Sequence, residues 1–172
     1  MRRQFSAVVA GVLIALTLSA PARAAHPEGQ GWTRVPNPPF DLPAGLTCDF
    51  AVHGDPLVDR VYYKTLTTRS DGSPRTEAAL GPLIYRFTNV STGATVRGDA
   101  SASALITHHD DGSLTYRLHG PLLLGVREGR GNLPRGLYIV DGAAWRVDVS
   151  ADNFRSVSGA YRIAQDLCAD LS

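Results

Sequence analysis

Residues 110–119 read DDGSLTYRLH, and this stretch decides the fold class. Its first four residues are typical of a tight hairpin connection, because glycine accepts a positive φ and aspartate can bond its own backbone. The next six alternate apolar and polar side chains with the period of a half-buried strand. Leu114, Tyr116 and Leu118 fall on one face, opposite Thr115, Arg117 and His119. The stretch therefore predicts a turn and then a strand with an apolar inner face.

The same pattern extends in both directions along the chain. Turn signals at 71–74, 91–93 and 141–142 separate further short alternating runs. We expect strands at about 46–53, 60–68, 81–90, 94–109, 114–126, 136–141, 143–150 and 153–163. About eight strands joined by short turns predict an all-β fold, a small closed or nearly closed antiparallel barrel, because closure removes exposed strand edges. A two-sheet β-sandwich is the alternative, since periodicity alone does not separate the two.

Composition excludes several classes of protein. The 172 residues carry 17 basic and 16 acidic side chains, a balance unlike that of a basic nucleic-acid-binding protein or an acidic disordered tail. Only one of the basic residues is Lys, and only three of the acidic residues are Glu. Because long surface helices draw on Glu and Lys, we expect none here.

The N-terminal segment has the pattern of an export signal. Residues 1–24 begin with two arginines, continue through an apolar run and end in Ala-Arg-Ala, which predicts a cleaved signal peptide and a secreted, extracellular protein. The apolar run is too short to span a bilayer comfortably, so we expect no membrane anchor in the mature form. Residues 25–46 form a Pro-rich extended leader, and 47–172 a single β domain. Without residues 1–24 the formal charge is about −2.

Two cysteines, Cys48 and Cys168, lie near the two ends of the predicted domain. An even number of cysteines in an exported chain favours one disulfide, which here would close nearly the whole domain. Two free thiols or a catalytic cysteine are the alternatives. Neither residue lies in a Cys-x-x-Cys pair, which makes those alternatives less favourable.

A series of short landmarks carries a resemblance to a known group of proteins. It runs from Gly81-Pro82-Leu83 through Thr92-Gly93, Asp111-Gly112-Ser113 and Gly136-Leu137-Tyr138 to Asp166-Leu167-Cys168-Ala169. In these features the chain resembles small, uncharacterised secreted β-rich proteins of high-GC actinobacteria. The Arg-over-Lys bias agrees with such an actinobacterial source. The resemblance implies export and a β-rich fold, and it transfers no catalytic residue.

No catalytic or metal-binding motif stands out. His108 and His109 are adjacent, and adjacent side chains of a strand point to opposite faces, so the pair does not predict a metal site. The common hydrolase signatures, including Gly-x-Ser-x-Gly and His-Glu-x-x-His, are absent from the sequence. We therefore assign no catalytic residue, no metal and no cofactor.

Aromatic side chains supply the candidate binding residues. The predicted inner face contains Tyr85, Tyr116 and Trp145. It also contains Tyr63 and His108 if the alternation of their strands places these two residues inward. In a filled barrel these rings are core, and in an open one they line a ligand pocket.

These observations predict a secreted, disulfide-stabilised β-barrel protein that binds a small-molecule ligand or an extracellular protein, with no nucleic-acid partner. An isomerase-like or hydrolytic enzyme at the barrel mouth is the first alternative, with His108 and a nearby Asp as acid and base, which predicts a carboxylate within hydrogen-bond reach of His108. An extracellular inhibitor or adhesion module acting through the 127–135 loop is the second.

Overall fold

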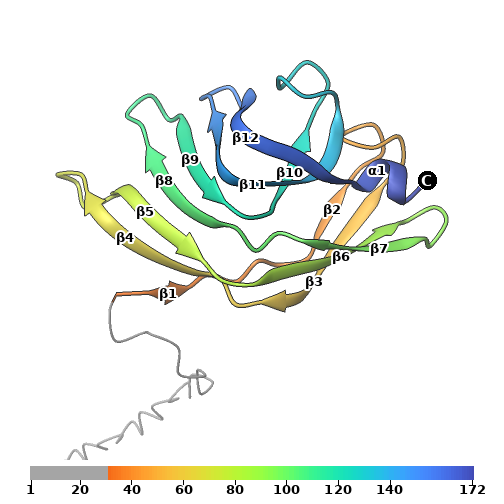
Figure 1. Ribbon diagram of the computed structural model, residues 1–172, viewed down its shortest axis with the longest axis horizontal. Helices are drawn as coiled ribbons and strands as arrows, with labels where there is room; N and C mark the ends of the chain where they lie inside the picture. Colours follow the sequence, from red (N-terminus) through yellow and green to blue (C-terminus); the bar gives the residue numbers. More distant parts are fainter. Residues whose placement is uncertain (1–30) are drawn as a thin grey trace, which may run out of the picture.

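The protein is all-β, with two antiparallel sheets, in a computed structural model that describes residues 31–172 (Figure 1). The predicted signal peptide and residues 25–30 of the predicted leader lie outside the described residues. The eight-stranded sheet contains β1 (Thr33–Arg34), β4 (Tyr62–Thr68), β5 (Pro74–Leu80), β8 (Ser103–His108), β9 (Leu114–His119), β10 (Leu122–Val126), β11 (Gly136–Val149) and β12 (Arg155–Asp166). The four-stranded sheet contains β2 (Phe40–Leu42), β3 (Val52–Asp59), β6 (Leu83–Asn89) and β7 (Thr95–Asp99).

The two sheets arise because long strands bend at their middles. β3 runs into β4, β5 into β6 and β7 into β8 across breaks of two or three residues that lead from one sheet to the other, and β9 runs into β10 across a similar break within the eight-stranded sheet. Gly81-Pro82 and Gly120-Pro121 form two of these breaks, and both glycines have a positive φ, +127° and +87°, that other residues rarely adopt. β11 bends without breaking, at a register shift between Asp141 and Ala144. The chain is thus an up-and-down meander whose two halves diverge at a common line of bends.

Both outer edges of this meander are covered by other segments. β1 and β2 pair with β4 and β3, so residues of the predicted leader lie along the first edge. At the other edge, the Arg155 N–H donates to the Arg130 carbonyl at 3.0 Å. The Asn132 side chain both donates to the Val157 carbonyl and accepts from its N–H, each at 2.8 Å. Covered edges cannot pair with one another, and covering is a common protection for edge strands.

The expected closed barrel is therefore not found. Within residues 31–172 no strand pairing joins β12 to β1, β3 or β4, whereas the two-sheet alternative fits. The leader occupies the edge formed by β3 and β4, residues 130–132 occupy the start of the β12 edge, and the adjacent sheet edges at β7 and β10 do not pair with each other among residues 31–172.

The hydrophobic core has two parts, one on each face of the N-terminal half of β11. Leu137 and Ile139 pack toward Val52 and Phe87 of the four-stranded sheet. Tyr138 and Val140, on the opposite face, pack in a second cluster with Leu118, Leu124, Val126, Trp145, Val147 and Val157. Strand alternation explains this division, because successive side chains point to opposite sides. A strand buried on both faces reads as the continuous apolar run that residues 137–140 form.

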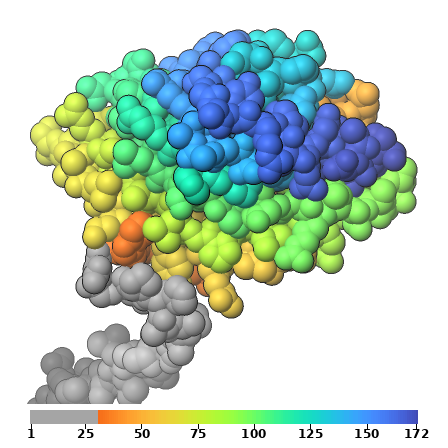
Figure 2. All heavy atoms as spheres, viewed as in Figure 1, coloured from red at the N-terminus to blue at the C-terminus, as the bar shows by residue number. Residues whose placement is uncertain are grey.

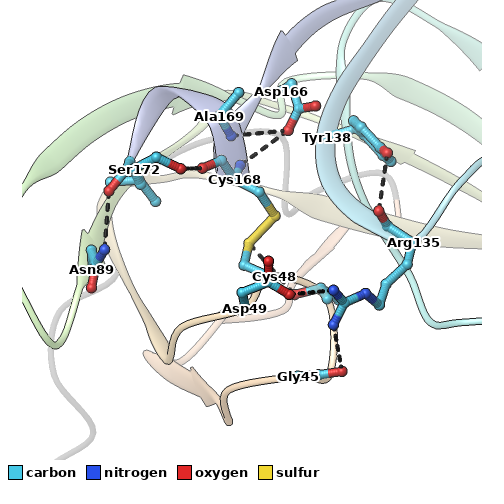
Figure 3. Close-up of a disulfide and its surroundings, with 12 residues drawn as sticks. Gly45, Cys48, Asp49, Asn89, Arg135, Tyr138, Asp166, Cys168, Ala169 and Ser172 are labelled. Atoms are coloured by element: carbon cyan, nitrogen blue, oxygen red, sulfur yellow. Dashed lines mark hydrogen bonds and ion pairs between the residues drawn. A yellow bond between two sulfur atoms is a disulfide. The ribbon is translucent and has the colours of Figure 1, made fainter.

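The predicted disulfide is present and connects the two ends of the meander. Cys48 precedes β3 and Cys168 lies in helix α1 (Leu167–Asp170), directly after β12. Figure 3 shows the local hydrogen bonds, in which the Asp166 carboxylate accepts from the N–H groups of Cys168 and Ala169 and caps the helix. The Asn89 side chain donates to the Leu171 carbonyl at 3.0 Å. The dark blue C-terminal residues lie against the green residues of β7 in Figure 2.

Candidate functional site

The inner face of the meander contains a cavity of about 230 Å³ at the line of bends. Its walls come from the leader and from β4, β5, β6, β8, β9, β10 and the breaks between them. The lining residues are Asn37, Val61, Tyr63, Ala79, Gly81, Leu83, Tyr85, Ala100, Ala102, Ala104, Ile106, Tyr116, Leu122 and Leu123. None of these side chains carries a formal charge at neutral pH, and four of them are alanine. Small side chains at the bends leave the space open.

Three of the predicted binding residues, Tyr63, Tyr85 and Tyr116, meet in this cavity. Strand register places them together, because Tyr63 is opposite Ala79 in β5 and Tyr116 is opposite Ile106 in β8. Among the described residues no protein group forms a hydrogen bond with any of the three hydroxyls. Three hydroxyls without protein partners in a mostly apolar cavity are the arrangement expected of groups that orient a ligand.

Burial keeps these phenols neutral. It raises the pKa of Tyr63, and the negative charges of Glu77 and Asp59 raise it further. The pKa of Tyr85 is raised first by burial and then by Asp59. For Tyr116, burial and the neighbouring Tyr63 raise the pKa, while the positive charge of Arg155 opposes the shift. The hydroxyls are therefore available as uncharged donors and acceptors.

His108 lies on the same face, beyond the rim of the cavity. Its Nε2 is 2.8 Å from a carboxylate oxygen of Glu77, and the two side chains are 31% and 18% exposed. Glu77 is opposite Ile106, which lines the cavity, so the pair lies beside the tyrosines. The Nδ1 atom of His108 has no partner in the part of the chain that the structure describes. A carboxylate that holds one imidazole nitrogen and leaves the other free is an arrangement used by general bases.

Trp145, the fifth predicted residue, is separate from the others. It is 3% exposed, and its indole N–H donates to the Gly120 carbonyl at 3.1 Å. Its ring packs near Tyr161, with 6.4 Å between ring centroids. Trp145 does not line the cavity, and its contacts are those of a core residue.

Sequence reasoning missed two polar groups at the site. Glu77 was overlooked because residues 74–80 were not expected to form a strand. Asn37 belongs to the leader, and its backbone N–H and side-chain amide both bond the Asp59 carboxylate, at 2.8 and 3.2 Å. The run Thr76-Glu77-Ala78-Ala79 does not alternate polar and apolar side chains, so only the pairing of β5 with β4 and β8 places Glu77 on the face of Ala79.

The other sequence candidates have structural roles. The His109 side chain contacts the face of β9 opposite Tyr116, where its Nε2 is 3.0 Å from the Thr115 hydroxyl. Within residues 31–172 no group of three metal-ligating side chains is present. The 127–135 loop lies along β12, where residues 130–132 cover its edge.

A larger hollow of about 690 Å³ lies on the outer face of the eight-stranded sheet. It is an open groove across β5, β8, β9, β11 and β12, with small and apolar residues such as Ala78, Leu80 and Leu105 along it. Ala79 and Ala104 line both this groove and the inner cavity, so the sheet is thin between them. The inner cavity is the more enclosed of the two and is lined by the three tyrosines, which makes it the candidate site.

Comparison of the chain with known protein families, with curated proteins and with solved structures found no match. In the described part of the chain, no helix is long and apolar enough to cross a membrane. The geometry of the site is therefore the basis of the functional argument.

Proposed function

We propose that this chain is a secreted, disulfide-stabilised β protein that binds a small ligand in the cavity lined by Tyr63, Tyr85 and Tyr116. The observation that carries the proposal is that one mostly apolar cavity is lined by three tyrosines whose hydroxyls have no hydrogen-bond partner among the described residues. In this proposal the curved sheet acts as a half-open barrel whose interior holds the ligand. The Cys48–Cys168 disulfide and the predicted signal peptide support an extracellular location.

The volume and the lining limit the ligand. A cavity of about 150 Å³ is sufficient for benzene, and this cavity has about 230 Å³. Drug-sized ligands need at least about 300 Å³. The ligand class is therefore one small ring with one or two polar substituents. It is uncharged, because no lining side chain would compensate a charge.

The test uses phenol as the probe and a variant that fills the cavity. Ala102→Leu adds side-chain volume in the cavity, and Ala144→Leu makes the same change on the exposed outer face. Titration followed by two-dimensional NMR should show saturable shifts around the cavity in the wild type and in A144L. A102L should lose them while remaining folded. Equal phenol binding in A102L and the wild type, or none in either, would contradict the proposal.

The contribution of individual hydroxyls to phenol affinity is tested separately by Tyr63→Phe and Tyr116→Phe, each of which removes one hydroxyl and keeps the ring. A neutral hydrogen bond contributes about 1 kcal/mol, so each change should weaken phenol about fivefold. Benzene, which has no hydroxyl, should bind the variants and the wild type equally. Loss of benzene binding would instead show that the change had altered the cavity itself.

A second candidate function is acid–base catalysis at the cavity rim, with His108 and Glu77 as the reacting pair. The specific observation is the 2.8 Å contact between His108 Nε2 and the Glu77 carboxylate beside the cavity. In this candidate Glu77 orients the imidazole, and Nδ1 takes the proton of a water molecule or of a substrate C–H group.

The chain offers a matched control for this candidate. His53 also contacts a carboxylate, with 2.8 Å between its Nδ1 and Asp41, but this pair is exposed on β2 and β3. Hydrolysis of p-nitrophenyl acetate should fall to the level of free imidazole in His108→Gln and stay unchanged in His53→Gln. Equal rates in the two variants would rule out catalysis by His108 in this reaction.

A further inference from the structure

A second, smaller cleft lies between the 127–135 loop and the turn that connects β11 to β12. Its volume is about 170 Å³, and it is lined by Arg127, Arg130, Asp152, Asn153 and Arg155. It shares no lining residue with the tyrosine cavity. The cleft and the cavity are therefore separate sites, although the charge of Arg155 reaches Tyr116.

Positive charge exceeds negative charge in this cleft. Arg130 forms an ion pair with Asp152, with 3.0 Å between Nη1 and the carboxylate. The side chain of Arg127 makes no hydrogen bond or ion pair within residues 31–172. Arg155 donates to the Gly125 carbonyl and has no carboxylate partner among the same residues. Two of the three guanidinium groups are thus uncompensated.

The position of Arg155 gives this excess of positive charge a cost in free energy. Its side chain is half-buried and follows the inner face from the start of β12, whereas an ordinary surface arginine extends into water. Burial, and then the neighbouring charge of Arg127, lower the pKa of Arg155. A half-buried cation beside a second cation costs free energy unless an anion compensates it.

The backbone holds these groups in place. The Arg130 N–H donates to the Arg127 carbonyl at 3.0 Å, and the Arg155 N–H donates to the Arg130 carbonyl at 3.0 Å. Gly131 forms a bridge with Arg155, and the Asn132 N–H donates to the Arg155 carbonyl at 3.2 Å. The loop and the strand therefore form one hydrogen-bonded unit. A cleft that is ordered before binding loses less entropy when a ligand enters.

We propose that this cleft binds a tetrahedral oxyanion, a phosphate or sulfate group, between the guanidinium groups of Arg127 and Arg155. A guanidinium presents its donors in a planar fork that matches two oxygens of such a group. The two guanidinium groups come from different segments, and the exposed Arg127 and the half-buried Arg155 can bind different oxygens of the same ion. Asp152 has the opposite effect, since it neutralises Arg130 and repels an anion.

The experiment titrates the folded protein with inorganic phosphate at constant ionic strength, at a pH well above the second pKa of phosphate, where the dianion predominates. Calorimetry gives the affinity, and the arginine Nε–Hε signals in NMR identify the residues bound. Arg127→Gln should weaken phosphate about tenfold, as expected for a lost charge-assisted hydrogen bond. Asp152→Asn should strengthen it about threefold, because Arg130 becomes available.

Arg146→Gln is the matched control, because Arg146 is paired with Asp148 at 2.6 Å and does not line the cleft. It should leave phosphate affinity unchanged. Arg155→Gln is used only for NMR, as its half-buried side chain could affect folding. If Arg127→Gln and Arg146→Gln weaken phosphate equally, the binding is diffuse and the proposal is wrong. It is also wrong if phosphate shows no saturation up to about 20 mM.

Two further probes define the ligand class and its source. Acetate should bind more weakly than phosphate or sulfate, and equal binding of acetate would overturn the tetrahedral class. Methyl phosphate distinguishes a phosphate ester from the free ion. Tighter binding of methyl phosphate assigns the cleft to the terminal group of an ester, and tighter binding of inorganic phosphate assigns it to the free ion. Neither result depends on phenol binding in the tyrosine cavity.

Discussion

Breaking the Cys48–Cys168 disulfide should destabilise the protein strongly, because no other covalent or strand-to-strand link joins the two ends of the described meander. The cysteines are 120 residues apart, with 5.3 Å between their Cα atoms. Cys48 is 2% exposed and belongs to the core between the two sheets. Reduction leaves every atom of that core in place and removes only the cross-link.

The loop length gives the expected magnitude. In the chain-entropy model a closed loop of this length lowers the entropy of the unfolded chain by about 16 cal/mol/K, which corresponds to about 5 kcal/mol at 25 °C. Loss of a native disulfide typically costs about 2–5 kcal/mol. For a domain of this size about 1 kcal/mol shifts the midpoint of thermal unfolding by about 3 °C. The midpoint should therefore fall by about 6–15 °C.

The assay is thermal unfolding followed by circular dichroism, with and without a phosphine reductant. The Cys48→Ala/Cys168→Ala variant should unfold at or slightly below the temperature of the reduced wild type, because it also loses the sulfur atoms of the buried Cys48 and the partly buried Cys168. Reductant should not change that variant, which controls for effects unrelated to the disulfide. If reduction shifts the wild-type midpoint by less than about 2 °C, packing alone holds the two ends together and the entropic argument is refuted.

Two further predictions concern the tyrosines and the covered edge of β12. Tyr63, Tyr85, Tyr116 and Tyr138 have raised pKa values in the folded protein, each chiefly through burial. Unfolded tyrosines lose their protons near pH 10, so unfolding releases protons in that range. The free energy of unfolding should therefore be unaffected by these tyrosines below about pH 10 and should fall as pH rises from there through their raised pKa values. Absorbance at about 295 nm and urea unfolding across this range check the sign, and Tyr116→Phe should reduce the loss. Asn132→Ala removes both side-chain bonds to Val157 and should cost about 1–3 kcal/mol in urea unfolding. Hydrogen exchange at the Val157 N–H should accelerate, and an unchanged rate would show that the loop does not protect this edge.

Local chemistry made the turns and faces predictable from sequence. Asp71 and Asp111 each accept two hydrogen bonds from the serine two residues later, at 2.7 and 2.9 Å, as expected of Asp-Gly-Ser turns. Tyr116 and Val147 are directly opposite in register, which confirms the predicted alternation of two strands. These features depend on neighbours within a few residues, so the sequence pattern contains them.

Features that depend on distant partners were not predictable in the same way. The predicted strand 46–53 overlaps β3 only at Val52 and His53. Gly54 and Pro56 are weak strand formers, and Pro56 lies beside a register shift in the pairing with β6. The strand β5 was missed because it begins with Pro74 and contains alanines, and its pairing with β4 and β8 overrides that weak propensity. Missing β5 also hid Glu77, the partner of His108. The closed barrel failed for a related reason, since segments outside the predicted strands cover both edges.

The bends that divide the sheet also create the candidate site. Gly81 allows one bend, and Ala100 and Ala102 form part of another, and all three line the cavity. Larger side chains at these positions would bury more apolar surface, and an unfilled cavity costs about 24 cal/mol per Å³. A structural role alone would favour filling this space, so an open cavity lined by three tyrosines whose hydroxyls have no partner within residues 31–172 argues for a ligand. On this argument Ala102→Leu should raise stability while it abolishes phenol binding, and a variant that loses both would show that the space is needed for packing.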